Sequence, residues 1–439
     1  MKYQQKVKVK VKVKKKRLYM RVYLNRLPKD ILNLIYLARN VAVKKRTHAY
    51  LVGGFVRDLI LGVPNFDLDI VVEADAFMFA SELAERLGAG LKTHPRFGTA
   101  TIAAPGKIKI DIATARSEKY PHPASLPVVS PGEVRQDLAR RDFTINALAI
   151  DLLPGNFGRL VDYYHGAGDL RAKVIRVLHD LSFIDDPTRI IRAVRFEQRF
   201  KFRIERRTLE LLKGAKNSGM LKRVSAHRLR DEIVLILKER RAYNCISRLN
   251  RLAGFDFIHP RIRLNKADFK LLKKIKGEVE WYEKNFPKRR TLDAWVMYFT
   301  ILLGSLNKKQ INRVCARSGL RKGDTKRIIS YYKFSPSKVP GLSKDIPPAR
   351  IHRILDPLSF EVILLIRAKH GNRLLNFHID RFFKFYNEAR PYVSGKDLAK
   401  SGLEPGPDYK KILSRLFYLQ LNGKIGSRQE ALGWIARRP

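Results

Sequence analysis

The stretch YLVGGFVRDLILGVPNFDLDIV, residues 50–71, decides the fold of the N-terminal half of this chain. An apolar run typical of a strand ends at Gly53 and Gly54, and a helical pattern follows. A second apolar run then carries Asp67 and Asp69. Alternate residues of a strand project to the same face, so we expect the two carboxylates to lie side by side.

The glycine turn and the acid pair contain the residue types of a phosphate-transfer site. Glycines let the backbone approach a phosphate, and the first N–H groups of the following helix lack partners within that helix. Arg57, one turn into the helix, can add a charge-assisted contact to a triphosphate. Asp67 and Asp69 can hold two Mg²⁺ ions, which would relieve their mutual repulsion. The stretch therefore predicts metal-dependent nucleotidyl transfer; an ordinary turn followed by two solvated aspartates is the alternative.

The charge balance indicates a polyanionic partner. The 439 residues suffice for two to four domains, and Lys and Arg number 89 against 41 Asp and Glu, a formal net charge of +48. Such an excess most often means a nucleic acid. An anionic membrane surface or a ribosome would also attract it, but neither explains the acid pair.

Cysteine usage and the N-terminal composition predict a cytoplasmic protein. Cys245 and Cys315 lack the spacing of a disulfide framework or a zinc finger, which favours a reducing compartment. The basic N-terminus has no apolar signal-peptide core. The longest apolar stretch, residues 295–306, is too short to span a bilayer, so no membrane partner is expected.

Residues 1–27 differ in composition from the rest. Residues 6–16 read KVKVKVKVKKK, an alternation that would cover one face of a strand with lysine. A disordered basic arm and an edge strand lying along RNA phosphates both fit this pattern. We expect residues 1–27 to form an arm outside the fold.

Hydrophobic periodicity predicts a small α/β unit followed by an all-α one. Residues 117–132 contain four prolines and predict a long loop. In the strand pattern KIKIDIAT, Asp111 is in line with two lysines and is a candidate third carboxylate. Strands are expected at 97–103, 107–113, 157–162 and 174–177. Helices are expected at 27–43, 74–87, 187–199, 205–215, 225–240, 241–252, 266–275, 289–304, 307–318, 321–332, 347–354, 358–369, 374–389, 394–401, 407–422 and 427–436.

Two later stretches carry charged residues at helical spacing. Residues 137–149, DLARRDFTINALA, place two arginines before Asp142 and put Asn146 one turn later. One arginine can contact phosphate while Asp142 orients it; a surface salt bridge of little energetic worth is the alternative. In residues 184–200, IDDPTRIIRAVRFEQRF, Asp186 is the expected N-cap of a helix. This helix carries a basic stripe at every third position: Arg189, Arg192 and Arg195.

Asp186 and Arg189 have the groups needed to read a base. Cytosine and adenine share an edge with an exocyclic amine next to a ring-nitrogen acceptor. A carboxylate accepts from the amine and a guanidinium donates to the ring nitrogen, whereas uracil and guanine present a carbonyl in place of the amine. A fixed pair of this kind would select C and A without a nucleic-acid template.

Six motifs, in this order, resemble those of the class II tRNA nucleotidyltransferase and bacterial poly(A) polymerase family. The resemblance covers about residues 48–240, and the remainder resembles the family only in being helical and basic. The motifs are GG-x-VRD at 53–58, DxD at 67–69, RRDFTINA at 140–147, D-x3-G-x2-DL at 162–170, the acid-acid-x-x-R helix with RAVRF at 192–196, and R-x3-E at 228–232.

The resemblance implies an α+β fold: a small polymerase-β-like nucleotidyltransferase head with a mixed sheet, then an all-α neck, body and tail. The expected head is residues 28–173. The neck, residues 174–240, would recognise the base and bind RNA, and residues 241–439 would form the body and tail that bind tRNA.

The resemblance also implies site residues and ligands. Catalysis and metal binding fall to Asp67 and Asp69, with Asp111 as the candidate third ligand. The cofactor would be two Mg²⁺ ions, the substrates CTP and ATP, and the acceptor a tRNA acceptor arm or another RNA 3′ end. Nucleotide binding falls to Gly53, Gly54, Arg57, Arg141, Asp142, Asn146, Asp186, Arg189, Arg192 and Arg195.

The activity implied is template-independent addition of the 3′-terminal CCA, or its final A, to tRNA. Asp185 stands where the family usually has glutamate, which bears on the choice between C and A. The residues around Asp186 and the full 117–132 loop argue against a CC-only enzyme. The alternatives are a poly(A) polymerase, a non-catalytic basic RNA-binding protein with a decayed head, and a ribosome-assembly factor.

Overall fold

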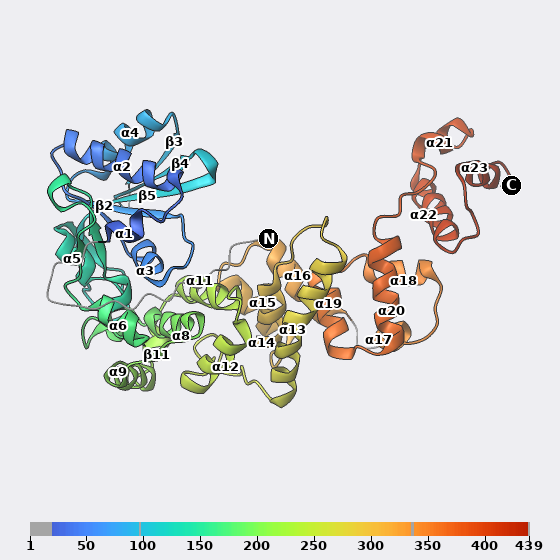
Figure 1. Cartoon of the computed structure of the whole chain (residues 1–439). Coiled ribbons are helices and arrows are strands. Elements are labelled where there is room, and N and C mark those ends of the chain that lie inside the picture. The colour runs from blue at the N-terminus through green and yellow to red at the C-terminus, as the bar shows by residue number, and fades with distance from the viewer. Residues whose placement is uncertain (1–19, 96–97, 335–337, 438–439) are drawn as a thin grey trace. The chain divides into compact units, whose positions relative to one another are not determined.

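The computed structural model of the chain describes residues 20–95, 98–334 and 338–437. The chain divides into two units, Met1–Val224 and Ser225–Pro439. The first contains the sheet and the second consists of helices (Figure 1). The expected fold class, a mixed-sheet head followed by helices, is therefore confirmed. The finer boundaries at residues 173 and 240 stay predictions.

A seven-stranded mixed sheet organises the first unit. β2 and β5 pair in parallel, and the other neighbouring strands pair antiparallel. The parallel pairing places Asp69 directly beside Asp111. In spatial order the strands are β3 (Gly90–His94), β4 (Thr99–Ala104), β5 (Ile108–Thr114), β2 (Leu68–Val72), β1 (Ala49–Val52), β8 (Ala149–Asp151) and β9 (Leu160–Val161).

Helices bury both faces of the sheet. On one face α4 (Ala76–Leu87) packs on β2, β4 and β5, and α2 (Lys29–Lys44) packs on α4 (Figure 1). On the other, α5 (Val134–Ala139) adds Val134 and Leu138 to a cluster with Tyr50 and Val71. Burial on both faces explains why the central strands are apolar at successive positions rather than alternating.

The last part of the expected N-terminal arm belongs to the head. Met20 and Leu24 are buried, and α1 (Arg21–Leu24) follows Met20 directly. The Met20 N–H donates to the Gly158 carbonyl at 2.6 Å, and the Arg21 side chain donates to the Phe157 carbonyl. The expectation that all of residues 1–27 lie outside the fold is thus wrong for residues 20–27, because two apolar side chains there find a core. The lysine–valine alternation lies outside the described residues.

The expected loop at residues 117–132 contains a short hairpin. β6 (Arg116–Lys119) pairs antiparallel with β7 (Val128–Pro131). Pro131 has no N–H to donate, so it is tolerated because this ladder has two strands and therefore two free edges. The four prolines led to the prediction of a loop throughout residues 117–132, whereas the two ends of this stretch pair as strands.

The helical period expected after residue 187 is confirmed. The neck helix α8 (Thr188–Phe200) lies in the chain between two short strands that pair in parallel, β10 (Val174–Ile175) and β11 (Arg203–Ile204). The other α-helices of the first unit are α3 (Gly54–Leu61), α6 (Gly166–Ala172), α7 (Ser182–Asp185), α9 (Arg206–Asn217) and α10 (Met220–Arg223).

The second unit is built around α14 (Ala294–Leu302), whose side chains are buried on every side. It packs on α11 (Ala226–Leu237), α13 (Lys266–Asn285), α16 (Lys322–Lys333) and α19 (Phe360–His370). The remaining helices are α12 (Ala242–Leu252), α15 (Lys308–Arg317), α17 (Lys338–Leu342), α18 (Pro348–Leu355), α20 (Arg373–Arg381) with a π-helical turn (Phe382–Tyr386), α21 (Gly395–Lys400), α22 (Pro407–Leu421) and α23 (Arg428–Ala436).

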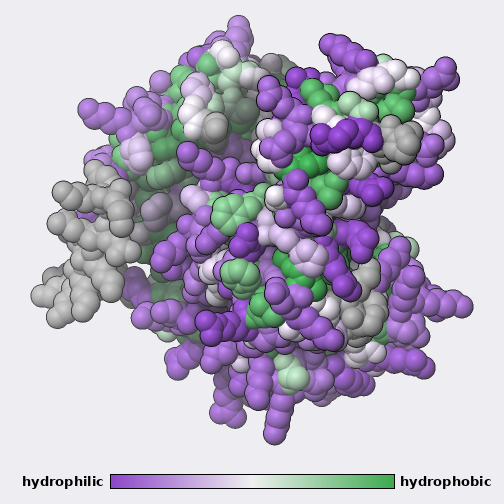
Figure 2. Space-filling view, turned by 90° about the vertical axis from the view of Figure 1, so that its right-hand side faces the viewer, coloured by the Kyte–Doolittle hydropathy of each residue, from purple (hydrophilic) through white to green (hydrophobic). Residues whose placement is uncertain are grey.

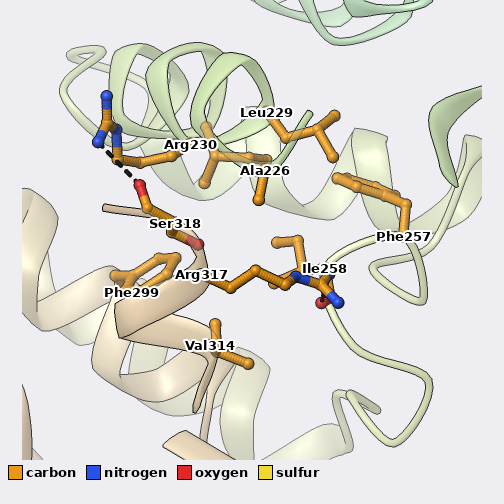
Figure 3. Close-up of a pocket in the computed structure, with 10 residues that line it drawn as sticks. Ala226, Leu229, Arg230, Phe257, Ile258, Phe299, Val314, Arg317 and Ser318 are labelled. Carbon is orange, nitrogen blue, oxygen red and sulfur yellow. Dashed lines mark hydrogen bonds between the residues drawn. The ribbon is translucent and has the colours of Figure 1, made fainter. Parts of the chain in front are cut away.

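One cation joins two helices of this unit. Arg230 of α11 donates to the carbonyls of Ser318 and Gly319, just beyond the end of α15, at 2.8 and 2.7 Å. Figure 3 shows this contact beside a small pocket that Leu229 and Phe257 line. A cation at a helix C-terminus satisfies carbonyls that lack intrahelical partners. Among the helices described, none is both long and apolar enough to cross a bilayer.

Gly166 locks α6 against the RRDFTINA segment. Its N–H donates to the Asp162 carboxylate at 2.7 Å, which caps the helix. A Cβ at Gly166 would overlap the Thr144 carbonyl, whereas one at Gly168 of the same helix would meet open space.

The Gly166→Ala variant should therefore destabilise the head by about 2 kcal/mol or more, as overpacking against rigid backbone does. Gly168→Ala is the matched control and should be neutral or stabilising by roughly 0.5–1 kcal/mol, since alanine is the better helix former. Hydrogen exchange of peptides spanning residues 140–176, followed against urea, measures both. Equal behaviour of the two variants would contradict the close packing of α6.

Candidate active site

The acid pair lies at the start of a central strand. Asp67 is exposed, Leu68 buried, Asp69 half-buried and Ile70 buried. This alternation is the one expected when two acids share a face. The Asp67 N–H donates to the side-chain oxygen of Asn65 at 3.1 Å, which fixes the chain just before β2.

Negative charge accumulates around Asp69. Burial raises the pKa of Asp69 to about 6; Arg141 opposes the rise, and Asp111 and Asp67 add to it. A carboxyl group whose charge is disfavoured by its acidic neighbours is stabilised by a cation between them. Carboxylate oxygens are the ligands that Mg²⁺ prefers, so the donor set of Asp67 and Asp69 fits such an ion.

Asp111 is beside the pair but has partners of its own. Thr101 donates to one carboxylate oxygen at 2.7 Å, and the Lys109 ammonium lies 2.5 Å from the other. Within the described ranges no cluster of three or more His, Cys, Asp or Glu side chains is arranged to hold a metal. Asp111 as a third ligand stays a prediction.

The glycine turn brings the Arg141 guanidinium next to the uncapped N-terminus of a helix. Gly53 has φ +65°, a left-handed conformation that favours glycine, and α3 (Gly54–Leu61) begins without a side-chain cap. A Cβ at Gly53 would overlap the Arg141 guanidinium, so only a glycine lets that group lie against the turn. Uncapped N–H groups and a guanidinium in one place attract an anion.

Asp137 holds this cation in place, a role not anticipated from the sequence. Its fully buried carboxylate accepts from Arg141 at 2.9 Å and from Arg140 at 2.5 Å. Burial alone would raise the pKa of Asp137, but the two guanidinium groups hold it below its usual range. The i,i+3 and i,i+4 spacing of the acid and the arginines was the available signal.

A series of buried hydrogen bonds starts at α3, the helix that follows the glycine turn. Arg57 donates to both oxygens of Asp58, at 2.8 and 2.9 Å, and to the Asn146 side-chain oxygen at 2.6 Å. Asn65 donates to Asp58 at 2.9 Å, so the same carboxylate also anchors the segment that leads to Asp67. The sequence motifs 53–58 and 140–147 are thus joined directly.

The series of hydrogen bonds continues from Asn146 to the neck helix through Asp142. Asn146 donates to one oxygen of Asp142 at 2.8 Å, and Arg192 donates to the other at 2.8 Å. Burial would raise the pKa of Asp142, yet Arg192 and Asn146 lower it to about 2. The carboxylate is buried, so the alternative of a surface salt bridge is excluded. The expectation that Asp142 orients Arg140 or Arg141 is also wrong, because its cation is Arg192 and Asp137 holds those two arginines.

Arg57 is buried instead of open to solvent. It is 5% exposed, and its guanidinium lies over the rings of Phe200 and Phe196, at 4.7 and 5.5 Å. The side chain thereby packs the start of α3 against α8. The expected contact between Arg57 and a triphosphate stays a prediction, and its visible partners are Asp58 and Asn146.

The base-reading candidates start the neck helix. The Asp186 carboxylate accepts from the Thr188 N–H at 3.0 Å, which is the first N–H of α8, although Pro187 holds the N-cap position, one residue later than expected. Arg189 is 3% exposed and donates to the Ser182 hydroxyl and to the Arg140 carbonyl, at 2.5 and 2.8 Å. Of the basic stripe, Arg189 and Arg195 are buried, so it is no ordinary solvated face.

Two family models match this chain. Residues 49–176 match the poly A polymerase head domain, and residues 201–264 match the probable RNA and SrmB-binding site of polymerase A. The first match includes the glycine turn, the acid pair and Asp142.

Relatives and a solved structure extend the similarity over nearly the whole chain. The A-adding tRNA nucleotidyltransferase of Halalkalibacterium halodurans is 31% identical over 92% of this chain and 92% of its own. That of Geobacter sulfurreducens is 35% identical over 92% of this chain but 47% of its own, so this chain spans about half that relative's length. A solved CCA-adding enzyme in its apo form II is 34% identical, with a TM-score of 0.79 over 95% of this chain and 98% of its own.

The motifs in their expected order, the sheet that carries them and the similarity over nearly the whole of this chain agree, and the chain belongs to the family of CCA-adding and A-adding tRNA nucleotidyltransferases.

Proposed function

We propose that this chain adds the 3′-terminal CCA, or its final A, to tRNA from CTP and ATP without a template. The observation that carries the proposal is the series of hydrogen bonds, buried from Asp58 to Asp142, that links the acid pair, the glycine turn and the neck helix. Solved structures support the ligands: a Thermotoga maritima CCA-adding enzyme is complexed with tRNA_CCA, and two further structures are of a CCA-adding enzyme complexed with ATP and with CTP.

The reaction is attack of an RNA 3′-hydroxyl on the α-phosphorus of the nucleotide, with pyrophosphate leaving. Asp67 and Asp69 would hold two Mg²⁺ ions. When bound, such ions lower the pKa of the hydroxyl and neutralise the leaving group. Asp69 is half-buried and lies beside Asp111, so its carboxylate is partly shielded from bulk water.

The glycine turn would bind the triphosphate. The uncapped N–H groups of α3 and the Arg141 guanidinium both face this turn. Asp137 fixes Arg141, so the cation loses little conformational freedom when a phosphate binds. Positioning and charge complementarity supply the catalysis, and no covalent enzyme intermediate is required.

The start of the neck helix would read the base. Asp186 and Arg189 supply the acceptor and donor that match cytosine and adenine. Arg189 is held by Ser182 and the Arg140 carbonyl, which makes its position independent of the nucleotide. The neck helix that carries Asp186 and Arg189 is joined to the head by the hydrogen bonds of Arg192 and Asn146 to Asp142.

A product assay tests the activity. The chain is incubated with Mg²⁺ and tRNA ending before CCA, after C, or after CC, and with CTP and ATP separately and together. Extension that stops at the completed CCA end supports the proposal. Extension of the tRNA that ends before CCA indicates addition of the whole CCA, whereas extension only of the tRNA that ends after CC indicates addition of the final A. Long A tails would indicate a poly(A) polymerase, and no incorporation a non-catalytic RNA-binding protein.

Removing either acid should abolish incorporation. We expect Asp67→Asn and Asp69→Asn, which keep the side-chain shape, to lower kcat by at least about 100-fold, since metal-supported charge neutralisation is lost. Binding of tRNA in a filter assay should stay within about twofold. Glu85→Gln, at an exposed acid of α4, is the control. Substantial turnover in either aspartate variant would exclude the metal assignment.

Gly53→Ala should weaken nucleotide binding. The new Cβ must displace the Arg141 guanidinium, so KM for ATP or CTP should rise at least about tenfold. Gly62→Ala is the control. Gly62 follows the last residue of the same helix and has the same φ of +65°, but a Cβ there would meet open space, so this variant has the backbone strain without the clash. An equal change in KM for both variants would show that strain, not Arg141, is responsible.

Asp186→Ala should reduce selection of C and A over U and G. The variant keeps the acid pair but loses the acceptor for the exocyclic amine, so the ratio of kcat/KM for ATP over GTP should fall at least about tenfold. Asp180→Ala, at an exposed acid of the same neck, is the control. Unchanged base preference in the Asp186 variant would exclude the reading role.

A further inference from the structure

A stripe of aromatic and basic side chains lies exposed along one helix of the second unit. Phe377 and Phe385 are 50% and 59% exposed, the highest values among large hydrophobic side chains in the described part of residues 225–439. They lie four residues before and four after Arg381, so all three share a face of α20 and the π-helical turn that follows it. We call these three residues the aromatic stripe.

Arg381 is held between the two rings. Its guanidinium lies 5.6 Å from the ring centre of Phe377 and 5.6 Å from that of Phe385. Its Nε donates to the hydroxyl of the buried Tyr386 at 2.7 Å. The cation therefore has a fixed position while the stripe remains open to solvent.

The π-helical turn is anchored by an aromatic cluster beneath it. Phe383 is buried against the rings of Tyr282, Phe286 and Phe360. Arg289 donates to the Phe383 carbonyl, which a widened turn leaves without its usual partner. The core thus fixes the backbone that presents Phe385.

The surroundings of the stripe are positively charged. Arg373, Arg381 and Lys384 are exposed on this segment. Its acids face other cations: Asp380 lies 4.0 Å from Arg367, and Glu388 lies 3.0 Å from Arg289. Figure 2, viewed from the side of the C-terminal helices, shows hydrophobic groups set among hydrophilic side chains rather than one large apolar face.

We infer that the aromatic stripe is an RNA-binding site at which Phe377 and Phe385 stack on unpaired nucleobases of the tRNA, while the neighbouring cations contact its phosphates. Aromatic rings interleaved with basic side chains are the physical requirement for binding unstacked bases. A lipid surface or a second protein copy would use the same apolar rings, but the positive charge favours a polyanion, and nucleobases use the flat faces of both rings. The inference rests on the proposed function, which supplies the tRNA.

Binding measurements on the full chain test the stripe. The double variant Phe377→Leu/Phe385→Leu keeps apolar bulk but loses both π faces, and its Kd for tRNA should rise roughly 5- to 100-fold. Phe377→Tyr/Phe385→Tyr keeps the faces and should bind within about twofold of the parent chain. Met78→Ala, at an exposed apolar residue of α4 in the first unit, is the surface control. A fully paired blunt RNA duplex, which offers no unstacked base in its interior, should bind all variants alike.

The outcomes separate the inference from the proposed function. Failure of the parent chain to bind or extend tRNA overturns both. If the parent extends tRNA and the leucine variant binds it equally well, the stripe is overturned and the proposed function stands. Equal losses of the leucine variant on tRNA and on the duplex would mean that its effect does not depend on unstacked bases, and this would also overturn the inference. A change in oligomeric state or in binding to anionic vesicles, with unchanged tRNA affinity, would assign the stripe to a second copy or to lipid instead.

Discussion

The burial of Asp142 is the constraint on which the first unit depends. A buried carboxylate is costly unless every oxygen has a partner, and here Asn146 and Arg192 supply the partners from two different elements. Asn146 then orients Arg57, which itself is buried. One desolvated charge therefore fixes the distance between the glycine helix, the RRDFTINA segment and the neck.

Two kinds of electrostatic environment lie close together in this unit. At Asp142 the pKa is low because the positive partners are part of the chain. At Asp69 it is high because burial and acidic neighbours outweigh Arg141. The charge of the first carboxylate is stabilised by groups of the protein, whereas the charge of the second is disfavoured by its surroundings. This contrast separates the two acids on physical grounds, although both look alike as letters in a motif.

The sequence predicted what is set by short spacing, and missed what depends on long-range burial. The two strands, the glycine turn and the alternation of Asp67 and Asp69 follow from local periodicity. The roles of Asn65 and Ser182 could not be predicted, since each depends on a partner that the fold brings close. The burial of Arg57 could not be predicted either, because the rings and the acceptor that surround it, Phe200 and Asn146, lie far away in the sequence.

The helical half shows the same division. Most helices after residue 187 begin within about two residues of the predicted start, since a period of 3.6 is a local property. However, α13 runs to Asn285 where an end at 275 was predicted, and the short helices α10 and α17 were not predicted. Which helix faces remain uncovered was not predicted, because Phe377 and Phe385 have the same helical spacing as core residues such as Phe383. Exposure is a property of the assembled unit and not of the pattern.

The buried position of Arg57 also dictates an order of events during synthesis. Its acceptor, Asn146, emerges from the ribosome some ninety residues later, and its stacking partner Phe200 later still. Until α8 is complete, Arg57 would have its neighbour Asp58 but not the ring of Phe200, and Asp142 would lack its cation Arg192 in a closing core. The head and the beginning of the neck are therefore expected to fold as one cooperative block. A chaperone acting on this chain would meet that block in an open state until about residue 200 has left the exit tunnel.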